Sequence, residues 1–162
     1  MKKILTLLTG IVFLITILAA GGCRNGNKQN EAILVENDST RVVYLKDTLI
    51  DGRMHLEMYN EKHPDKKEID TLTTDVRPGY TVIWKHAHKS KIKKVNHIRP
   101  LNLIKENGKI FSKEAEEVES KSLYTYEIPS TAKPGKEKYE IIFKDKNDDF
   151  WCIDPYLRIP DD

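Results

Sequence analysis

The side chains with the clearest capacity for chemistry are two histidines in the second half of the chain. His86 and His88 stand two positions apart, so an extended backbone through them would place both imidazoles on one face. Two imidazoles can hold Cu(II), Ni(II) or Zn(II) weakly, because imidazole nitrogen suits these metals. Repulsion from neighbouring cations opposes a tight site, and we expect the pair to lie in a solvated loop. The neighbouring cations are Lys85, Lys89, Lys91, Lys93 and Lys94.

Cys152 is the other candidate, and its chemistry depends on burial. A reactive thiol needs an accessible position and a partner base, whereas a buried cysteine behaves as a small hydrophobe. The neighbours Trp151 and Ile153 are apolar. We therefore predict that Cys152 packs inside the domain at the end of a strand. The alternatives are a metal ligand and a reactive or intermolecular thiol.

Motifs of established enzyme classes are absent from the sequence. It has no nucleophile turn of the Gly-x-Ser-x-Gly type, no glycine-rich phosphate loop and no His-Glu zinc pair. We predict no enzymatic activity and no catalytic residue. Aromatic side chains could stack on sugars, although aromatics at strand spacing more often form a core. The aromatic side chains in question are Trp84, Tyr124, Tyr139 and Trp151.

Short strands must position these residues. Asp51-Gly52 separates two β-favouring runs, and an Asp-Gly pair in that setting predicts a tight hairpin, because both central positions of a type I′ turn need positive φ. After this pair, apolar side chains alternate with polar ones and should face the core. The alternating apolar residues are Met54, Leu56 and Met58.

Further strands are expected along the rest of the chain. Pro78-Gly79 opens a turn onto a strand with Tyr80, Val82 and Trp84 on one face. About seven or eight short strands with turn residues between them favour an all-β fold, an antiparallel Greek-key β-sandwich. Other strands are predicted near 92–98, 123–128, 139–143 and 150–159, a second tight turn at Asn107-Gly108, and an exposed loop at 112–121.

The amino-terminal stretch has the layout of an export signal. Lys2 and Lys3 precede an almost unbroken apolar run, and small residues lead directly into Cys23. The ending Ala19–Cys23 resembles the lipobox of bacterial lipoproteins, with Ala20 where that family favours leucine. The resemblance implies diacylation of Cys23, cleavage before it and acylation of the new amino terminus. The alternatives are an uncleaved transmembrane helix, since the run is about 17 residues long, and a coincidental cysteine in a secreted protein.

Charge and length place limits on the mature protein. We expect a signal peptide at 1–22, a lipidated cysteine and flexible tether at 23–40, and the sandwich domain at 41–162. The chain has 27 basic and 25 acidic residues, and the signal removes two lysines, so the mature protein is formally neutral. Neutrality argues against nucleic acid as a partner, and against an anionic membrane surface as the main partner. The expected partners are the membrane, through lipid on Cys23, and an unknown protein or glycan.

The order of predicted strands resembles the cupredoxins, the plastocyanin-like blue-copper sandwiches. The segment 77–85, Arg-Pro-Gly-Tyr-Thr-Val-Ile-Trp-Lys, is similar to the family's strand with the pattern Pro-Gly-Asp-Thr-Val-x-Trp. The segments 124–129 and 139–143 look like its penultimate strand pair. An immunoglobulin-like sandwich is the alternative, because it shares this strand periodicity.

The cupredoxin resemblance also implies where copper ligands would stand. Cys152 falls about where the family places its copper-ligating cysteine, and the upstream histidine has candidates in His86, His88 and His97. A blue-copper site takes two histidines and a cysteine, usually with a weak axial methionine. The segment 153–160 contains neither histidine nor methionine. We therefore expect a cupredoxin-like scaffold without type-1 copper and without another cofactor.

These features together predict a lipid-anchored lipoprotein of a bacterial cell envelope that faces the periplasm or the cell exterior. Its β-sandwich would serve as a non-catalytic binding or interaction module. One alternative is a metal-binding or redox cupredoxin relative that uses Cys152 and nearby histidines. A carbohydrate-binding module is a further alternative.

Overall fold

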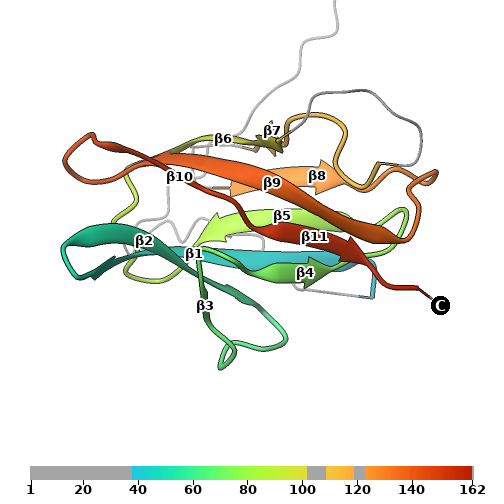
Figure 1. The fold of residues 1–162 in the computed structure, drawn as a ribbon, viewed down its shortest axis with the longest axis horizontal. Coiled ribbons are helices and arrows are strands. Elements are labelled where there is room, and N and C mark those ends of the chain that lie inside the picture. The colour runs from blue at the N-terminus through green and yellow to red at the C-terminus, as the bar shows by residue number, and fades with distance from the viewer. Residues whose placement is uncertain (1–37, 102–108, 119–122, 162) are drawn as a thin grey trace, which may run out of the picture. The chain divides into compact units, whose positions relative to one another are not determined.

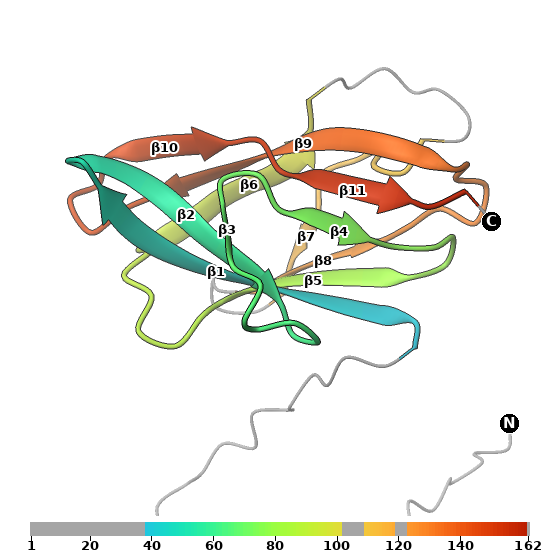
Figure 2. The ribbon, with the colours of Figure 1, turned by 60° about the horizontal axis from the view of Figure 1, so that its bottom comes forward.

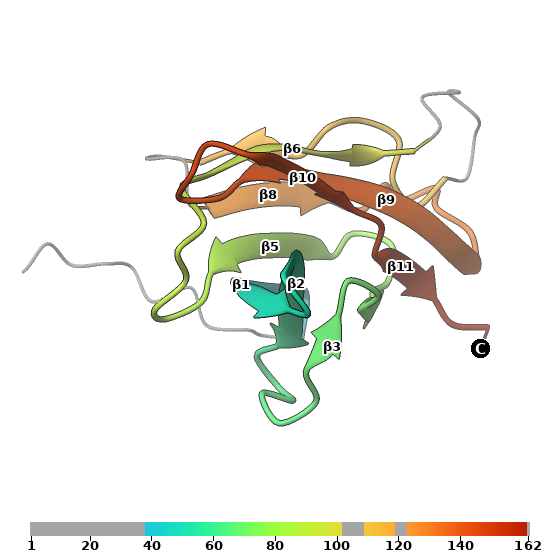
Figure 3. The same cartoon turned by 60° about the vertical axis from the view of Figure 1, so that its left-hand side comes forward.

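The sandwich domain is seen in a computed structural model that describes residues 38–101, 109–118 and 123–161, all within the compact unit Leu34–Asp162. These residues contain strands and no helix. The strands form two mixed sheets packed face to face, with β9, β10 and β11 on one side and β1, β2 and β5 on the other (Figures 1 and 3). The predicted all-β sandwich is confirmed. The predicted signal, residues 23–37 of the predicted tether including Cys23, and the turn at Asn107-Gly108 lie outside the described residues. Thr40, the last residue of the predicted tether, begins β1.

The first sheet has six strands in the order β3-β2-β1-β5-β8-β7. Its edge strands, β3 and β7, have only two residues each. The strands of this sheet are β1 (Thr40–Ile50), β2 (Arg53–Asn60), β3 (Glu68–Ile69), β5 (Thr81–His86), β7 (Glu116–Glu117) and β8 (Leu123–Glu127).

The second sheet is built around β9 (Gly135–Lys144). One edge of β9 pairs with β6 (Lys94–Pro100), and the other pairs with β10 (Phe150–Ile153) and β11 (Tyr156–Ile159). β10 and β11 keep one register against β9, so they are two halves of a single strand. Asp154-Pro155 interrupts it, because proline has no N–H to give to a ladder. β4 (Thr73–Asp75) pairs with β11.

Two neighbouring strand pairs are parallel, which differs from the predicted antiparallel arrangement. β1 runs parallel to β5, and β4 runs parallel to β11. Parallel neighbours need a crossover connection. Between β1 and β5 the chain passes through β2 and then through β4 of the second sheet, so it returns beside β1 in the same direction.

The hairpin between β1 and β2 has the predicted turn. Asp51 and Gly52 have φ angles of 49° and 76°, the positive values that a type I′ turn requires. Leu56 and Met58 are fully buried, and Met54 packs against the core. The prediction for the core-facing side chains of this strand is confirmed.

Aromatic side chains fill the centre of the core. Trp84 and Tyr139 are fully buried, and the indole Nε1 of Trp84 donates a hydrogen bond to the Tyr139 hydroxyl at 2.9 Å. Phe111 stacks near Trp84, with ring centroids 6.0 Å apart. Tyr124 is also buried, and Trp151 packs against the core while partly exposed. Three of the four residues considered for sugar stacking therefore belong to the core, as strand spacing predicted, and Trp151 packs against it.

The two ends of the sandwich differ. The β1–β2 and β9–β10 hairpins lie at one end, whereas β1 begins and β11 finishes at the opposite end (Figure 2). We call the end where β1 begins and β11 finishes the entry end, because the described chain enters the domain there. At this end Thr81 of β5 donates its N–H to the carbonyl of Ser39. The described ranges include no helix with the length and apolar character that crossing a membrane requires.

Candidate functional site

Cys152 lies on β10 and is exposed, so the prediction that it is buried is wrong. Side chains alternate along a strand. Trp151 and Ile153 both point toward the core, which sends Cys152, between them, to the outer face of the second sheet. The apolar neighbours that suggested a buried thiol are themselves the inward-facing residues.

A carboxylate and a guanidinium lie beside the thiol on this face. Cys152 Sγ is 3.6 Å from Oε2 of Glu140. Arg99 pairs with Glu140 across β6 and β9, and its Nε donates to Oε1 of the same carboxylate. Partial desolvation, followed by the charge of Glu140 and the hydrogen bond to it, raises the pKa of the Cys152 thiol to about 11. Because nucleophilic attack and metal ligation both use the thiolate, this cysteine is weakly reactive at neutral pH.

Alkylation should report the protonation of this thiol. In a Cys23→Ser variant, where Cys152 is the only thiol, we expect alkylation at pH 8 about tenfold slower than that of free cysteine, since fewer thiolates outweigh their higher nucleophilicity. The rate should keep rising with pH toward the raised pKa. Glu140→Gln removes a negative neighbour, so it should lower the pKa and speed the reaction. The measurement is the iodoacetamide rate against pH, and a rate at pH 7 equal to that of free cysteine would contradict the arrangement.

His97 shares the outer face with Cys152 but stands two strands away. Ile142 of β9 pairs with His97 on one side and with Cys152 on the other. Strand spacing therefore separates the two backbones by about 10 Å. Nδ1 of His97 lies 2.5 Å from Oε1 of Glu114, which holds the imidazole against the 109–118 segment.

His86 and His88 do not form a pair on one strand face. β5 ends at His86, and His88 is exposed in the turn that follows. His86 faces inward with Val82 and Trp84, and within the described part of the chain its Nε2 is buried without a hydrogen-bond partner. Burial lowers the pKa of His86, and the charge of Asp47 opposes this shift. The prediction that both histidines lie in a solvated loop is therefore confirmed for His88 and wrong for His86.

The four candidate metal ligands therefore do not lie together in the structure. Cys152 and His97 lie on the outer face of the second sheet, His86 faces the core from the first sheet, and His88 lies in a loop. Across residues 38–101, 109–118 and 123–161, no group of three or more His, Cys, Asp or Glu side chains is arranged to hold a metal ion.

Two hollows at the entry end were not predicted from the sequence. One has a volume of about 410 Å³ and lies where β1, the end of β2 and β4 meet. We call it the entry hollow, and it is lined by Arg41, Asn60, Lys66 and Asp75 among others. The other, about 580 Å³, is lined by Arg77, Pro78, Tyr80, Pro134, Ile159, Pro160 and Asp161. The only sequence signal for the entry hollow was the charged loop after β2, because its floor comes from strands far apart in the chain.

No protein-family model matches this chain, and no curated protein matches its sequence.

Proposed function

We propose that the protein is a lipid-anchored lipoprotein of a bacterial cell envelope whose β-sandwich is a non-catalytic binding module. The observation that carries the anchor is the sequence itself, a charged start and an apolar run ending in small residues directly before Cys23. Each buried CH₂ contributes about 0.8 kcal/mol to membrane binding, so two or three acyl chains hold a protein firmly where one does not.

The arrangement of the domain supports a binding role. The entry hollow is formed by residues from strands of both sheets, so the fold itself holds its walls in place. Arg41 shows this, because its guanidinium lies 4.7 Å from the ring centroid of Tyr80 and its Nε donates to the carbonyl of Asp75. Concave sites with a few fixed polar groups are the usual places for ligands.

A metal or redox role has less support from the geometry. A copper site needs a thiolate and imidazoles that converge on one point. Here the thiol of Cys152 is protonated at neutral pH, and His86 and His97 belong to different sheets. We propose a cupredoxin-like relationship for the scaffold of the domain, without a copper site. Three of the four aromatic residues suggested for sugar binding, Trp84, Tyr124 and Tyr139, are buried in the core.

Replacing Cys23 tests the anchor, and the chain offers a matched control in its second cysteine. We expect Cys23→Ser to lose incorporation of labelled palmitate and to leave the membrane fraction, because no thioether can form. Cys152→Ser should retain both properties. The measurement is metabolic labelling of cells that express each variant, followed by fractionation. Membrane attachment of Cys23→Ser without palmitate would favour an uncleaved helix and would refute the lipid anchor.

A further inference from the structure

We propose that Leu34 and Val35, from the segment that precedes β1, occupy the second hollow at the entry end. We call it the proline hollow, because its lining includes Pro78, Pro134 and Pro160 together with Tyr80 and Ile159. Its volume of about 580 Å³ is within the range of sites that hold small ligands, roughly 300–1,000 Å³. The inference goes beyond the proposed function, and the docking itself does not depend on the lipid anchor.

The walls of the proline hollow are mainly apolar. Its three prolines are exposed, Tyr80 is half-buried and packs against the core, and Ile159 is buried. The charged residues of the lining within the described ranges, Arg77 and Asp161, carry opposite charges. Contiguous apolar surface with balanced charge at its margin favours an apolar occupant over a charged one.

The segment before β1 contains such an occupant. Residues 24–40 have a single run of apolar side chains, Ala-Ile-Leu-Val at 32–35, between polar and charged neighbours. Leu34 and Val35 are the last two members of this run, and they belong to the same compact unit as the described domain, Leu34–Asp162. Removing leucine and valine side chains from water is favourable. The run therefore favours contact with apolar surface that lies within its reach.

The described chain enters the domain beside the proline hollow. The N–H of Thr81 donates to the carbonyl of Ser39 at 2.9 Å, and Thr81 directly follows Tyr80 of the lining. Val35 precedes Ser39 by four residues, a span of at most about 14 Å, and Leu34 precedes it by five, at most about 18 Å. Both side chains can therefore reach the hollow while β1 stays paired with β5.

A segment of the same chain has an advantage over a separate partner at this hollow. Its covalent link to β1 makes the contact intramolecular, and short linkers give effective concentrations in the millimolar range. The entropy cost of closing a loop rises with loop length, and only a few residues separate Val35 from β1. A separate protein would have to displace Leu34 and Val35 before it could use the hollow.

Docking would also limit the reach of the binding module from its anchor, a consequence that rests on the proposed function. Leu34 follows Cys23 by 11 residues, and Thr40 follows it by 17. The free tether would then span at most about 40 Å instead of about 60 Å. A partner of the module would therefore have to come closer to the membrane than the full tether length requires.

Disulfide cross-linking of the full chain in neutral detergent tests where this segment lies. A Cys152→Ser background removes the exposed thiol. Under oxidised glutathione, Val35→Cys should cross-link with Pro160→Cys at least about tenfold faster than with Lys66→Cys, because docking raises the effective concentration in one hollow only. Lys66 is the matched control, since it is exposed like Pro160 but lines the entry hollow. Mass spectrometry of the linked peptides separates these products from any that involve Cys23.

Thermal unfolding of the full chain gives an independent measurement. Leu34→Ser should lower the Tm by about 5 °C, because it removes an apolar side chain from the hollow. Leu49→Ser makes the same change at a side chain that is 68% exposed near the opposite end of β1, and it should shift the Tm by less than about 2 °C. Equal cross-linking of the two cysteine pairs, or a Leu34→Ser shift no larger than that of the control, would overturn the proposal.

Discussion

Trp84→Ala should destabilise the domain by about 3–5 kcal/mol, the range for removing a large buried aromatic side chain. Trp84 is fully buried, and its rings contact those of Phe111 and Tyr139. The substitution also leaves the buried hydroxyl of Tyr139 without its indole donor, which adds to the cost. Since small domains have a total stability of about 5–15 kcal/mol, the variant should lose a large part of the domain's stability. Urea denaturation followed by circular dichroism measures this loss.

Two further variants separate packing from hydrogen bonding at this position. Tyr139→Phe removes the acceptor and keeps the ring, so it should cost about 1–2 kcal/mol. Phe150→Ala removes an aromatic ring that is 61% exposed, and it should change stability by less than about 0.5 kcal/mol. A loss below about 1 kcal/mol for Trp84→Ala would mean that Trp84 is not at the centre of the core.

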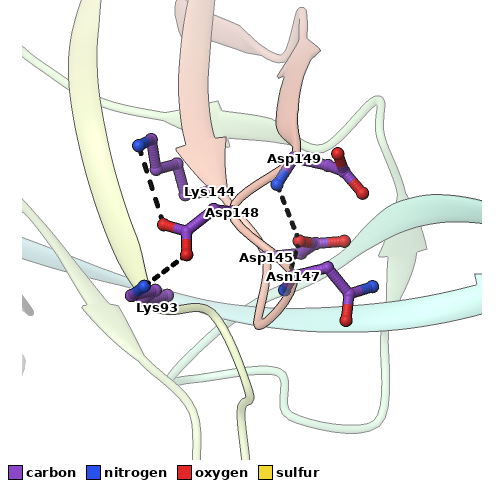
Figure 4. Close-up of polar contacts among 6 residues, drawn as sticks. All are labelled: Lys93, Lys144, Asp145, Asn147, Asp148 and Asp149. Atoms are coloured by element: carbon purple, nitrogen blue, oxygen red, sulfur yellow. Dashed lines mark hydrogen bonds and ion pairs between the residues drawn. The ribbon is translucent and has the colours of Figure 1, made fainter.

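Asp145→Ala should cost about 3 kcal/mol, because one buried carboxylate organises the β9–β10 hairpin. Asp145 is only 2% exposed. Its Oδ1 accepts hydrogen bonds from the backbone N–H groups of Asn147 and Asp149, at 2.8 and 3.1 Å (Figure 4). Its Oδ2 accepts a bond from the indole of Trp151 at 3.3 Å. Alanine leaves all three donors without this acceptor, and thermal unfolding measures the effect.

The same hairpin contains a control with similar chemistry at the surface. Asp148 lies 2.6 Å from Nζ of Lys93 and 3.7 Å from Nζ of Lys144, and its side chain is 54% exposed (Figure 4). Exposed ion pairs contribute about 0–1 kcal/mol. Asp148→Asn, which tolerates the positive φ of 70° at this position, should therefore change stability by less than about 1 kcal/mol. Equal losses for the two substitutions would contradict the structural role of Asp145.

Local patterns in the sequence were sufficient to predict most strands. Three features each depend on neighbouring residues alone. They are the Asp51-Gly52 turn, the alternation of buried Leu56 and Met58 with polar residues, and the break at Asp154-Pro155. The parallel pairing of β1 with β5 could not be predicted in this way. It depends on which sheet the chain visits between the two strands, and no short motif specifies that choice.

The candidate site was harder to predict because it depends on which face a strand presents. The position of Cys152 follows from the same alternation that was used correctly elsewhere, but its apolar neighbours were interpreted as a sign of burial on all sides. The entry hollow joins Arg41, Asn60 and Asp75, which only the tertiary fold brings together. Their proximity has no signal in the sequence.

The most direct test of the proposed function is the mass of the mature amino terminus. Protein purified from the membrane fraction of the native host should begin at Cys23 and carry the added mass of a diacylglyceryl group on that cysteine. A chain that begins at Met1, or a Cys23 with an unmodified thiol, would contradict the lipid anchor on which the proposed role of the domain depends.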